Sequence, residues 1–317
     1  MGAHSPKKYF IIINLHAGGA NAKKVWPDIQ KQLAAAHADY QTLYTAYPNH
    51  AVELAEQALS EIDTANQTDA VLIAAGGDGT LHETLLGCQH YYRTHQNDHP
   101  VPIAFLPVGS GNDFARGLKI PLHWEKALAD ILTQSAAKTI NVGHYTDLDH
   151  HSEGFFTNNF GIGFDATVVH LANHSSLKSH QFFGQFSYMA AILNVIIHFK
   201  GFKTEILPGN MPKVTFDNTF LLTTTDIPYF GGGINIVPSA SVFDDHLDLV
   251  VVEKTSLWQL ILFVSMIFLK RHLRLKFIHH YHEKELFIKT NGNRLGQIDG
   301  EELGERTFNL KLDTVKY

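Results

Sequence analysis

Residues 71–87 read VLIAAGGDGTLHETLLG, and this stretch decides the fold of the first part of the chain. An aliphatic run typical of a buried strand passes through GGDGT into apolar residues at helical spacing. Glycines between a strand and a helix let backbone N–H groups approach a ligand closely, and the helix N-terminus adds partial positive charge. The stretch therefore predicts an anion site, usually one for phosphate, where a strand ends.

The residues around this stretch repeat the same alternation. Strands are predicted at 10–14, 42–45, 70–75 and 102–108, with helical patterns between them. Such alternation builds a parallel sheet with helices on both faces, and its ligands bind at the carboxyl ends of the strands. Each glycine-rich break falls at such an end: NLHAGG (14–19), GGDGT (76–80) and GSGND (109–113).

The pattern changes after about residue 140. Short β-branched or aromatic segments separated by turn residues predict an antiparallel sandwich or split barrel. Apolar stretches at 182–199 and 257–270 predict two helices in this part. We therefore expect an α/β domain over 1–140 and a β-sandwich domain over 141–317.

Composition restricts the class of partner and the compartment. The 317 residues carry a formal charge of −6, so no global positive field attracts nucleic acid. Cys88 is the only cysteine, which excludes a disulfide framework and favours a reducing compartment. The longest apolar run, 257–269, is too short to span a bilayer, and we expect a cytoplasmic protein.

Asp78 is the one charge within GGDGT. A carboxylate in a phosphate site would repel the ligand unless a cation lay between them, so Asp78 indicates Mg²⁺, bound directly or through water. Thr80 can cap the following helix and offer a hydroxyl. The alternative is a tight turn in which Asp78 is an N-cap.

The second glycine motif, GSGNDFARGL, again places glycines between a predicted strand and a predicted helix. Ser110 can reach a phosphate or ribose oxygen, and Asn112 or Asp113 is predicted to cap a helix beginning at Phe114. A capped helix after a strand, with no ligand, fits these residues equally well.

Together the motifs resemble a known family. VLIAAGGDGTLHE, FLPVGSGNDFARGL and QIDGEELG resemble the diacylglycerol kinase catalytic-domain family, the soluble bacterial lipid kinases related to sphingosine and ceramide kinases. The first motif is shared with NAD kinases and phosphofructokinases, whereas the second motif narrows the match to lipid kinases. The resemblance covers nearly the whole chain and implies a Rossmann-like α/β ATP-binding domain, a C-terminal β-sandwich domain and an active site in the cleft between them.

The resemblance also implies roles for individual residues. ATP would be the phosphate donor, and Asp78 and Asp113 would organise a catalytic Mg²⁺, largely through water. The nucleotide site would comprise Asn14, Thr45, Gly76, Gly77, Asp78, Gly79, Thr80, Glu83, Ser110 and Glu301. Asp299 would be the general base, because an aliphatic hydroxyl barely ionises at pH 7 and a carboxylate must take its proton. Without the resemblance, an ordinary D-G hairpin turn is the plainer interpretation of Asp299.

Two features depart from the family pattern. A structural Mg²⁺ is implied at Ser241, Asp244 and His246, with some of the contacts made by backbone carbonyls, but Asp245 stands where the family has glycine. Asn141 stands where the family often has aspartate, which removes one negative charge from the metal network. A plain acidic turn at 241–246, and a nucleotide-binding regulator that has lost turnover, therefore remain alternatives.

The acceptor implied by the resemblance is a lipid. We predict transfer of the γ-phosphate of ATP to a hydroxyl of diacylglycerol or a related lipid, with a sphingoid lipid or an NAD-like acceptor as alternatives. Residues 257–269 precede a basic cluster, as transient contact with an anionic membrane requires: Lys270, Arg271, Arg274 and Lys276. A core helix is the alternative, because the segment is apolar nearly all round. The family often forms dimers, and a homodimer is left open.

Histidine is abundant, with 21 residues in the chain. The pairs at 150–151 and at 170 and 174, and the run HHYH at 279–282, are arranged as zinc ligands often are. No cysteine or acidic residue completes a tetrahedral set at the usual spacing, so we interpret them as scattered surface histidines.

Overall fold

The computed structural model describes residues 7–95, 100–134, 136–174 and 194–317. Contacts divide the chain into two compact units. The first extends to Thr139 and includes the C-terminal Tyr317, and the second comprises Ile140–Lys316.

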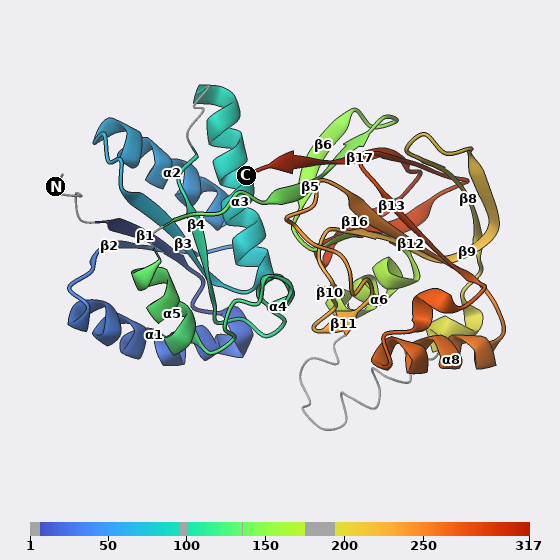
Figure 1. Ribbon diagram of the computed structural model, residues 1–317, viewed down its shortest axis with the longest axis horizontal. Helices are drawn as coiled ribbons and strands as arrows, with labels where there is room; N and C mark the ends of the chain where they lie inside the picture. The colour runs from blue at the N-terminus through green and yellow to red at the C-terminus, as the bar shows by residue number, and fades with distance from the viewer. Residues whose placement is uncertain (1–6, 96–99, 135, 175–193) are drawn as a thin grey trace. The chain divides into compact units, whose positions relative to one another are not determined.

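The first unit is built on a parallel sheet of four strands in the order β2-β1-β3-β4 (Figure 1). The strands are β1 (Lys8–Ile13), β2 (Asp39–Tyr44), β3 (Ala70–Gly76) and β4 (Ile103–Pro107). Each corresponds to a strand predicted from the sequence, and the α/β prediction is confirmed. Because the strands are parallel, all of their carboxyl ends lie at one edge of the sheet.

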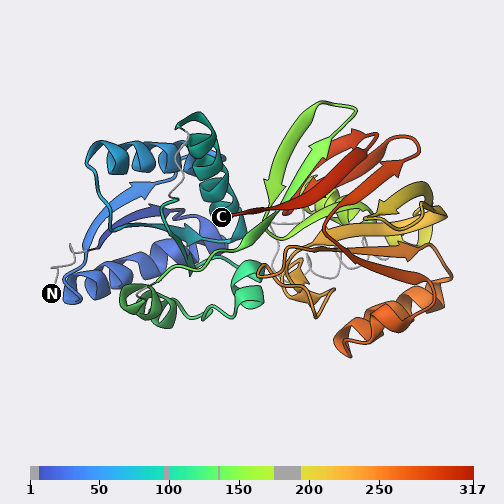
Figure 2. The same ribbon diagram turned by 45° about the horizontal axis from the view of Figure 1, so that its top comes forward.

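Helices cover both faces of this sheet (Figures 1 and 2). They are α1 (Ala17–Ala35), α2 (His50–Thr64), α3 (Asp78–His95), α4 (Asp113–Leu118) and α5 (Trp124–Thr133). Strand β1 alternates between the faces: Ile11 packs in the cluster formed with α1 and α5, and Ile12 in the cluster formed with α2 and α3. The sheet is thus buried on both sides, as its continuous apolar strands require.

The second unit is antiparallel and β-sandwich-like, as predicted. Its main sheet has 11 strands, nine of them in the order β16-β15-β7-β9-β8-β14-β17-β5-β6, with β12 joining β9 to β13. The bounds are β5 (Asn141–Asp147), β6 (Ser152–Phe156), β7 (Asn159–Gly163), β8 (Phe202–Pro208), β9 (Val214–Thr225), β12 (Leu247–Glu253), β13 (Ile278–Glu283), β14 (Leu286–Thr290), β15 (Arg294–Ile298), β16 (Glu301–Arg306) and β17 (Asn309–Lys316). A separate hairpin pairs β10 (Tyr229–Phe230) with β11 (Ile234–Asn235).

The described helices of this unit are α6 (Phe164–His174), α8 (Leu257–Phe268) and the short 3₁₀ helix η2 (His272–Arg274). The helix predicted at 257–270 is confirmed as α8. Most of the helix predicted at 182–199 lies outside the described residues, and 194–198 are helical. Among the helices that the structure describes, none has the length and apolar character needed to cross a membrane.

Candidate functional site

The loops after all four parallel strands meet at the carboxyl edge of the first sheet. Backbone hydrogen bonds continue between the strands just beyond their last residues: Asn14 N donates to Ala75 O (3.1 Å), and Thr45 N donates to Ile13 O (3.0 Å). The N–H groups of Val108 and Gly109 both donate to Gly76 O at 2.9 Å. The structure therefore brings the glycine-rich breaks together at the edge where the sequence predicts them.

Close packing of these loops requires glycine at particular positions. A Cβ atom on Gly109 would lie 2.4 Å from Gly77 Cα, and one on Gly18 would lie 2.7 Å from Val108 O. Gly18 also has a φ of 63°, which disfavours L side chains. Because these contacts are with backbone, no side-chain movement could relieve them. Beside the contacts, Gly79 and Ser110 are exposed to solvent.

The carboxylate of Asp78 caps a helix other than its own. Asp113 N donates to Asp78 Oδ2 and Phe114 N to Asp78 Oδ1, each at 3.0 Å. Asn112 stands at the N-cap position of α4, which begins at Asp113 and not at Phe114, but its side chain makes no capping hydrogen bond. Its Nδ2 donates to Gly109 O instead (3.0 Å). Asp78 thus fastens the first glycine motif to the second.

This cap limits how Asp78 and Asp113 could hold a cation. Each Asp78 oxygen accepts a hydrogen bond from an N–H group of α4, so the protein itself fixes the orientation of this carboxylate. The Asp113 side chain is 4% exposed, and its Oδ1 lies 3.7 Å from Arg116 Nε. That Asp78 and Asp113 organise a Mg²⁺ ion through water stays a prediction.

Glu83 and Thr80 also make contacts with other residues of the first unit. Glu83 accepts hydrogen bonds from Asn49 N and Ala51 N, both at 3.1 Å, and so caps the start of α2. Thr80 lies inside the first turn of α3 and does not cap it, which corrects the prediction. Its buried Oγ1 would lie 2.2 Å from a Cβ on Gly76, so only glycine fits there. Their nucleotide contacts stay predictions.

Asp299 occupies the turn between β15 and β16, in the second unit. Its φ is 51°, and the next residue, Gly300, has a φ of 88°, as a tight D-G turn requires. The Asp299 carboxylate accepts four hydrogen bonds from the β6–β7 turn: from Thr157 N (2.7 Å), Thr157 Oγ1 (2.9 Å), Asn158 N (2.8 Å) and Asn159 N (2.9 Å). These donors hold the carboxylate in one orientation.

Asp226 is a buried acid that the sequence interpretation missed. It is 1% exposed, its Oδ2 accepts a hydrogen bond from Gly143 N (3.1 Å), and its Oδ1 has no hydrogen-bond partner among the described residues. Burial, with the nearby Asp299 carboxylate, raises the pKa of Asp226 well above its ordinary value. The available signal was an acid directly after the LLTTT strand. Two residues before Gly143, Asn141 donates from N and Nδ2 to Val242 O (2.7 and 3.2 Å).

The loop from Ser241 to His246 is compact. Ser241 O accepts from Asp244 N (2.9 Å), and His246 Nδ1 lies 2.7 Å from Asp244 Oδ1. The hydrogen bond from His246 lowers the pKa of the Asp244 carboxyl. Asp245, which replaces the expected glycine, pairs with Lys284 Nζ at 2.6 Å. The three predicted residues are therefore neighbours, and whether they hold a metal stays a prediction.

Glu301 and its neighbour Glu302 begin strand β16. Glu301 is exposed, and its contact with nucleotide or metal stays a prediction. Glu302 is engaged with helix α6: its Oε2 lies 2.7 Å from His170 Nδ1, and its Oε1 accepts from Asn173 Nδ2 at 3.0 Å.

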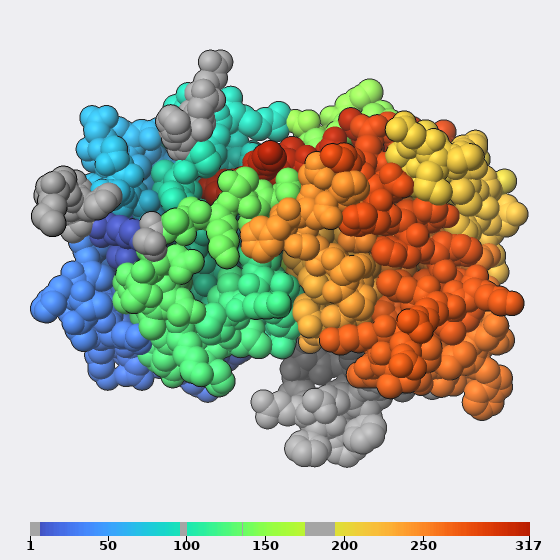
Figure 3. Space-filling view, in the orientation of Figure 1, coloured from blue at the N-terminus to red at the C-terminus, as the bar shows by residue number. Residues whose placement is uncertain are grey.

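Helix α8 carries an exposed apolar surface. Of its residues, Leu260 and Phe263 are buried, whereas Trp258 is 80% and Phe268 83% exposed. The core-helix interpretation therefore does not apply to the outer face of α8. The basic residues after it are exposed: Lys270, Arg271, Arg274 and Lys276. In the space-filling view the helix lies at the surface of its unit (Figure 3).

Both units match known families. Residues 8–145 match the diacylglycerol kinase catalytic domain, and residues 159–313 match the YegS C-terminal NAD kinase beta sandwich-like domain. The chain belongs to the diacylglycerol kinase family. The prediction of a lipid kinase is thereby confirmed at the level of the family, and so is the order of its two folds.

Several proteins are similar to this chain over most of their own length. The protein YtlR of Bacillus subtilis (strain 168) is 28% identical over 310 residues, which cover 95% of this chain and 96% of YtlR. A diacylglycerol kinase of Staphylococcus saprophyticus is 28% identical, with 96% and 92% covered. The crystal structure titled as a putative diacylglycerol kinase from Bacillus anthracis str. Sterne has the same fold, with a TM-score of 0.72 at 22% identity. The match covers 97% of this chain and 94% of the chain in that crystal structure.

Proposed function

We propose that this member of the diacylglycerol kinase family is an ATP- and Mg²⁺-dependent lipid kinase. It transfers the γ-phosphate of ATP to a hydroxyl of diacylglycerol or a related lipid. The observation that carries the proposal is the meeting of three glycine-rich loops at the carboxyl edge of the parallel sheet. The N-terminus of helix α3 also lies at that edge and favours a polyanion.

In the first unit the chain binds and orients the nucleotide. Phosphoryl transfer needs charge neutralisation and alignment more than covalent chemistry. Backbone N–H groups of the loops hold the phosphates, and Asn14, Thr45 and Ser110 stand at the same edge to complete the nucleotide site. Asp78 and Asp113 would hold the Mg²⁺ ion, which would supply charge neutralisation on the phosphates.

In the second unit Asp299 takes the proton of the acceptor hydroxyl. Its carboxylate is oriented by four donors from Thr157, Asn158 and Asn159, so little reorientation is needed when the hydroxyl arrives. The buried Asp226 lies near enough to interact electrostatically with Asp299. The raised pKa of Asp226 favours its neutral form, so Asp299 is the one of these two carboxylates that accepts the proton.

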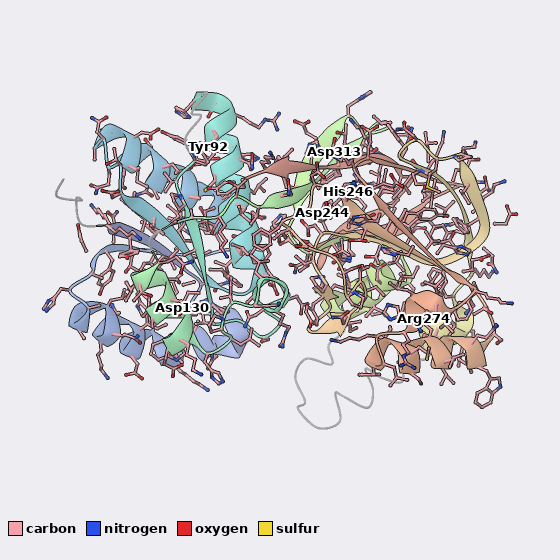
Figure 4. All side chains as sticks on the ribbon, in the orientation of Figure 1. Tyr92, Asp130, Asp244, His246, Arg274 and Asp313 are labelled. Atoms are coloured by element: carbon pink, nitrogen blue, oxygen red, sulfur yellow. The ribbon has the colours of Figure 1, made fainter. Side chains whose placement is uncertain are left out.

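The lipid is reached at a membrane surface through α8. The outer face of this helix presents Trp258 and Phe268, and Arg271 and Arg274 follow it. An apolar face bordered by basic residues matches the interface of an anionic bilayer. Figure 4 labels Arg274 beside the helix.

The test is transfer of radiolabel from ATP to a panel of diacylglycerol, sphingoid bases and NAD in mixed micelles. We expect labelled phosphatidic acid, and Asp299→Asn should lower its formation by at least about a hundredfold, the typical contribution of a general base. The control is Asp217→Asn, because the Asp217 side chain is 86% exposed.

Asp299 also has a structural role, so nucleotide affinity and unfolding must be measured for Asp299→Asn. A folded, nucleotide-binding variant with full transfer would remove Asp299 as the base. Nucleotide binding by the wild-type protein without transfer to any acceptor would instead favour the regulator.

A further inference from the structure

Two neighbouring residues of one loop and a third that is distant in the sequence form a group that we call the Asp244 cluster: Asp244, His246 and His282. One ligand atom from each lies within 4.8 Å of the others. Asp244 Oδ1 is 2.7 Å from His246 Nδ1, and Asp244 Oδ2 is 3.3 Å from His282 Nε2. The imidazole rings stack at 4.7 Å between centroids with an interplanar angle of 8°. Both rings thus present a nitrogen to one carboxylate, and Figure 4 labels Asp244 and His246.

The side-chain donors of the Asp244 cluster do not suit Mg²⁺, which the family resemblance places on this loop at Ser241, Asp244 and His246, partly through backbone carbonyls. Mg²⁺ requires near-octahedral oxygen ligands, whereas imidazole nitrogen suits Zn²⁺ and related transition metals. Two of the three donors in the cluster are imidazoles, so Mg²⁺ would find one side-chain oxygen ligand here.

A buried carboxylate orients one of the rings. Asp248 is 1% exposed, and its Oδ1 lies 3.1 Å from His282 Nδ1 and 2.6 Å from His280 Nε2. Strand pairing fixes this contact, because Asp248 on β12 stands opposite His282 on β13. A carboxylate that accepts the Nδ1 proton leaves the Nε2 lone pair available, here on the side of Asp244. Metal-binding histidines almost always have such a partner.

We propose that the Asp244 cluster binds one divalent transition metal of the Zn²⁺ class, with water as the fourth ligand. Tetrahedral bonds of 2.0–2.1 Å place ligand atoms about 3.3 Å apart. The Asp244–His282 separation already has this value. His246 needs to move from its hydrogen bond with Asp244 by only about half an ångström to match it. The metal joins the loop before β12 to strand β13.

The partly exposed cluster leaves room for the ion to enter, since Asp244 is 43%, His246 30% and His282 44% exposed at the side chain. Asp245, beside His246 at 3.0 Å, adds negative charge, although Lys284 offsets part of it. Because the site uses no residue of the proposed phosphate-binding loops, zinc binding and phosphoryl transfer can fail independently.

The experiment is a zinc titration of the chelator-treated protein by calorimetry, in millimolar Mg²⁺. We expect one equivalent of Zn²⁺ at the cluster, undisplaced by Mg²⁺, and a higher melting temperature in its presence. His282→Ala should weaken zinc binding at least about tenfold. The control is His170→Ala, because a second group that could hold a metal, His170, His174 and Glu302, lies elsewhere in this unit.

Unchanged zinc affinity in His282→Ala, or loss of this zinc ion in His170→Ala, would overturn the proposal, as would displacement by Mg²⁺. A further measurement does not depend on the folding of a His282 variant. X-ray absorption of the zinc-loaded His170→Ala protein should count two imidazoles on the metal, and a count of one or none contradicts the assignment.

Discussion

Removing the Asp78 carboxylate should destabilise the first unit even when no metal or nucleotide is present. Asp78 accepts two hydrogen bonds from the first N–H groups of α4, each at 3.0 Å. A hydrogen bond to a charged group contributes about 1.5–3 kcal/mol, and loss of a helix cap costs about 0.5–2 kcal/mol. Asp78 is partly exposed, so the lower values apply. We expect Asp78→Ala to lose about 2 kcal/mol and Asp78→Asn, which keeps one acceptor oxygen, about half of that.

Intrinsic fluorescence can report on the first unit alone. The chain has three tryptophans, and two of them, Trp26 and Trp124, lie in the first unit. In a Trp258→Phe background, urea unfolding followed by fluorescence therefore measures this unit. The buffer should contain a chelator and no nucleotide, so that any loss is due to the cap.

The control substitution is Asp28→Ala. The Asp28 carboxylate pairs with Lys31 at 2.7 Å, but its side chain is 58% exposed, and an exposed pair contributes about 0–1 kcal/mol. If Asp78→Ala unfolds at the same urea concentration as Asp28→Ala in chelator, the capping role is wrong. A defect confined to buffers with Mg²⁺ would then assign Asp78 to metal binding alone.

Three further predictions concern other parts of the chain. Burial raises the pKa of Asp165 to about 6, so between about pH 4 and 6 the folded state binds a proton that the unfolded state releases, and the protein loses stability as the pH rises. In urea unfolding, Asp165→Asn should therefore raise the free energy of unfolding by up to about 3 kcal/mol at pH 8 and by little at pH 4. Trp258→Glu with Phe268→Glu should lower binding to sedimented anionic vesicles at least about tenfold without lowering the melting temperature, and unchanged binding would remove α8 as the membrane contact. Gly109→Ala should cost about 1–3 kcal/mol because its Cβ meets backbone at 2.4 Å, whereas Gly79→Ala, with open space at its Cβ, should change stability by less than about 0.5 kcal/mol.

The sequence was a reliable guide wherever the signal is local. Apolar periodicity located all four parallel strands, and the strand–helix alternation required them to be parallel. Parallel strands end at one edge, so the meeting of the glycine-rich loops followed without any knowledge of long-range contacts. The D-G turn at Asp299 and the helix at 257–268 are likewise indicated by residues that are adjacent in the sequence.

Polar strands are hard to predict from the sequence for a physical reason. β13 reads IHHYHE and β15 reads RLGQI, and neither has the aliphatic content that marks a buried strand. They are strands because neighbouring strands supply hydrogen-bond partners along both sequences. Such pairing is tertiary context, which a window of a few residues cannot contain.

Only the tertiary structure decided which groups the acidic side chains contact. Asp78 caps a helix that begins 35 residues later, and Asp248 reaches His282, 34 residues away, because β12 and β13 pair in that register. His282, one of the histidines interpreted from the sequence as scattered surface residues, contacts the carboxylates of Asp244 and Asp248 because of the same strand pairing. Local periodicity determines where strands and helices lie, whereas contacts between distant side chains depend on register and loop packing, which form only when the whole chain folds.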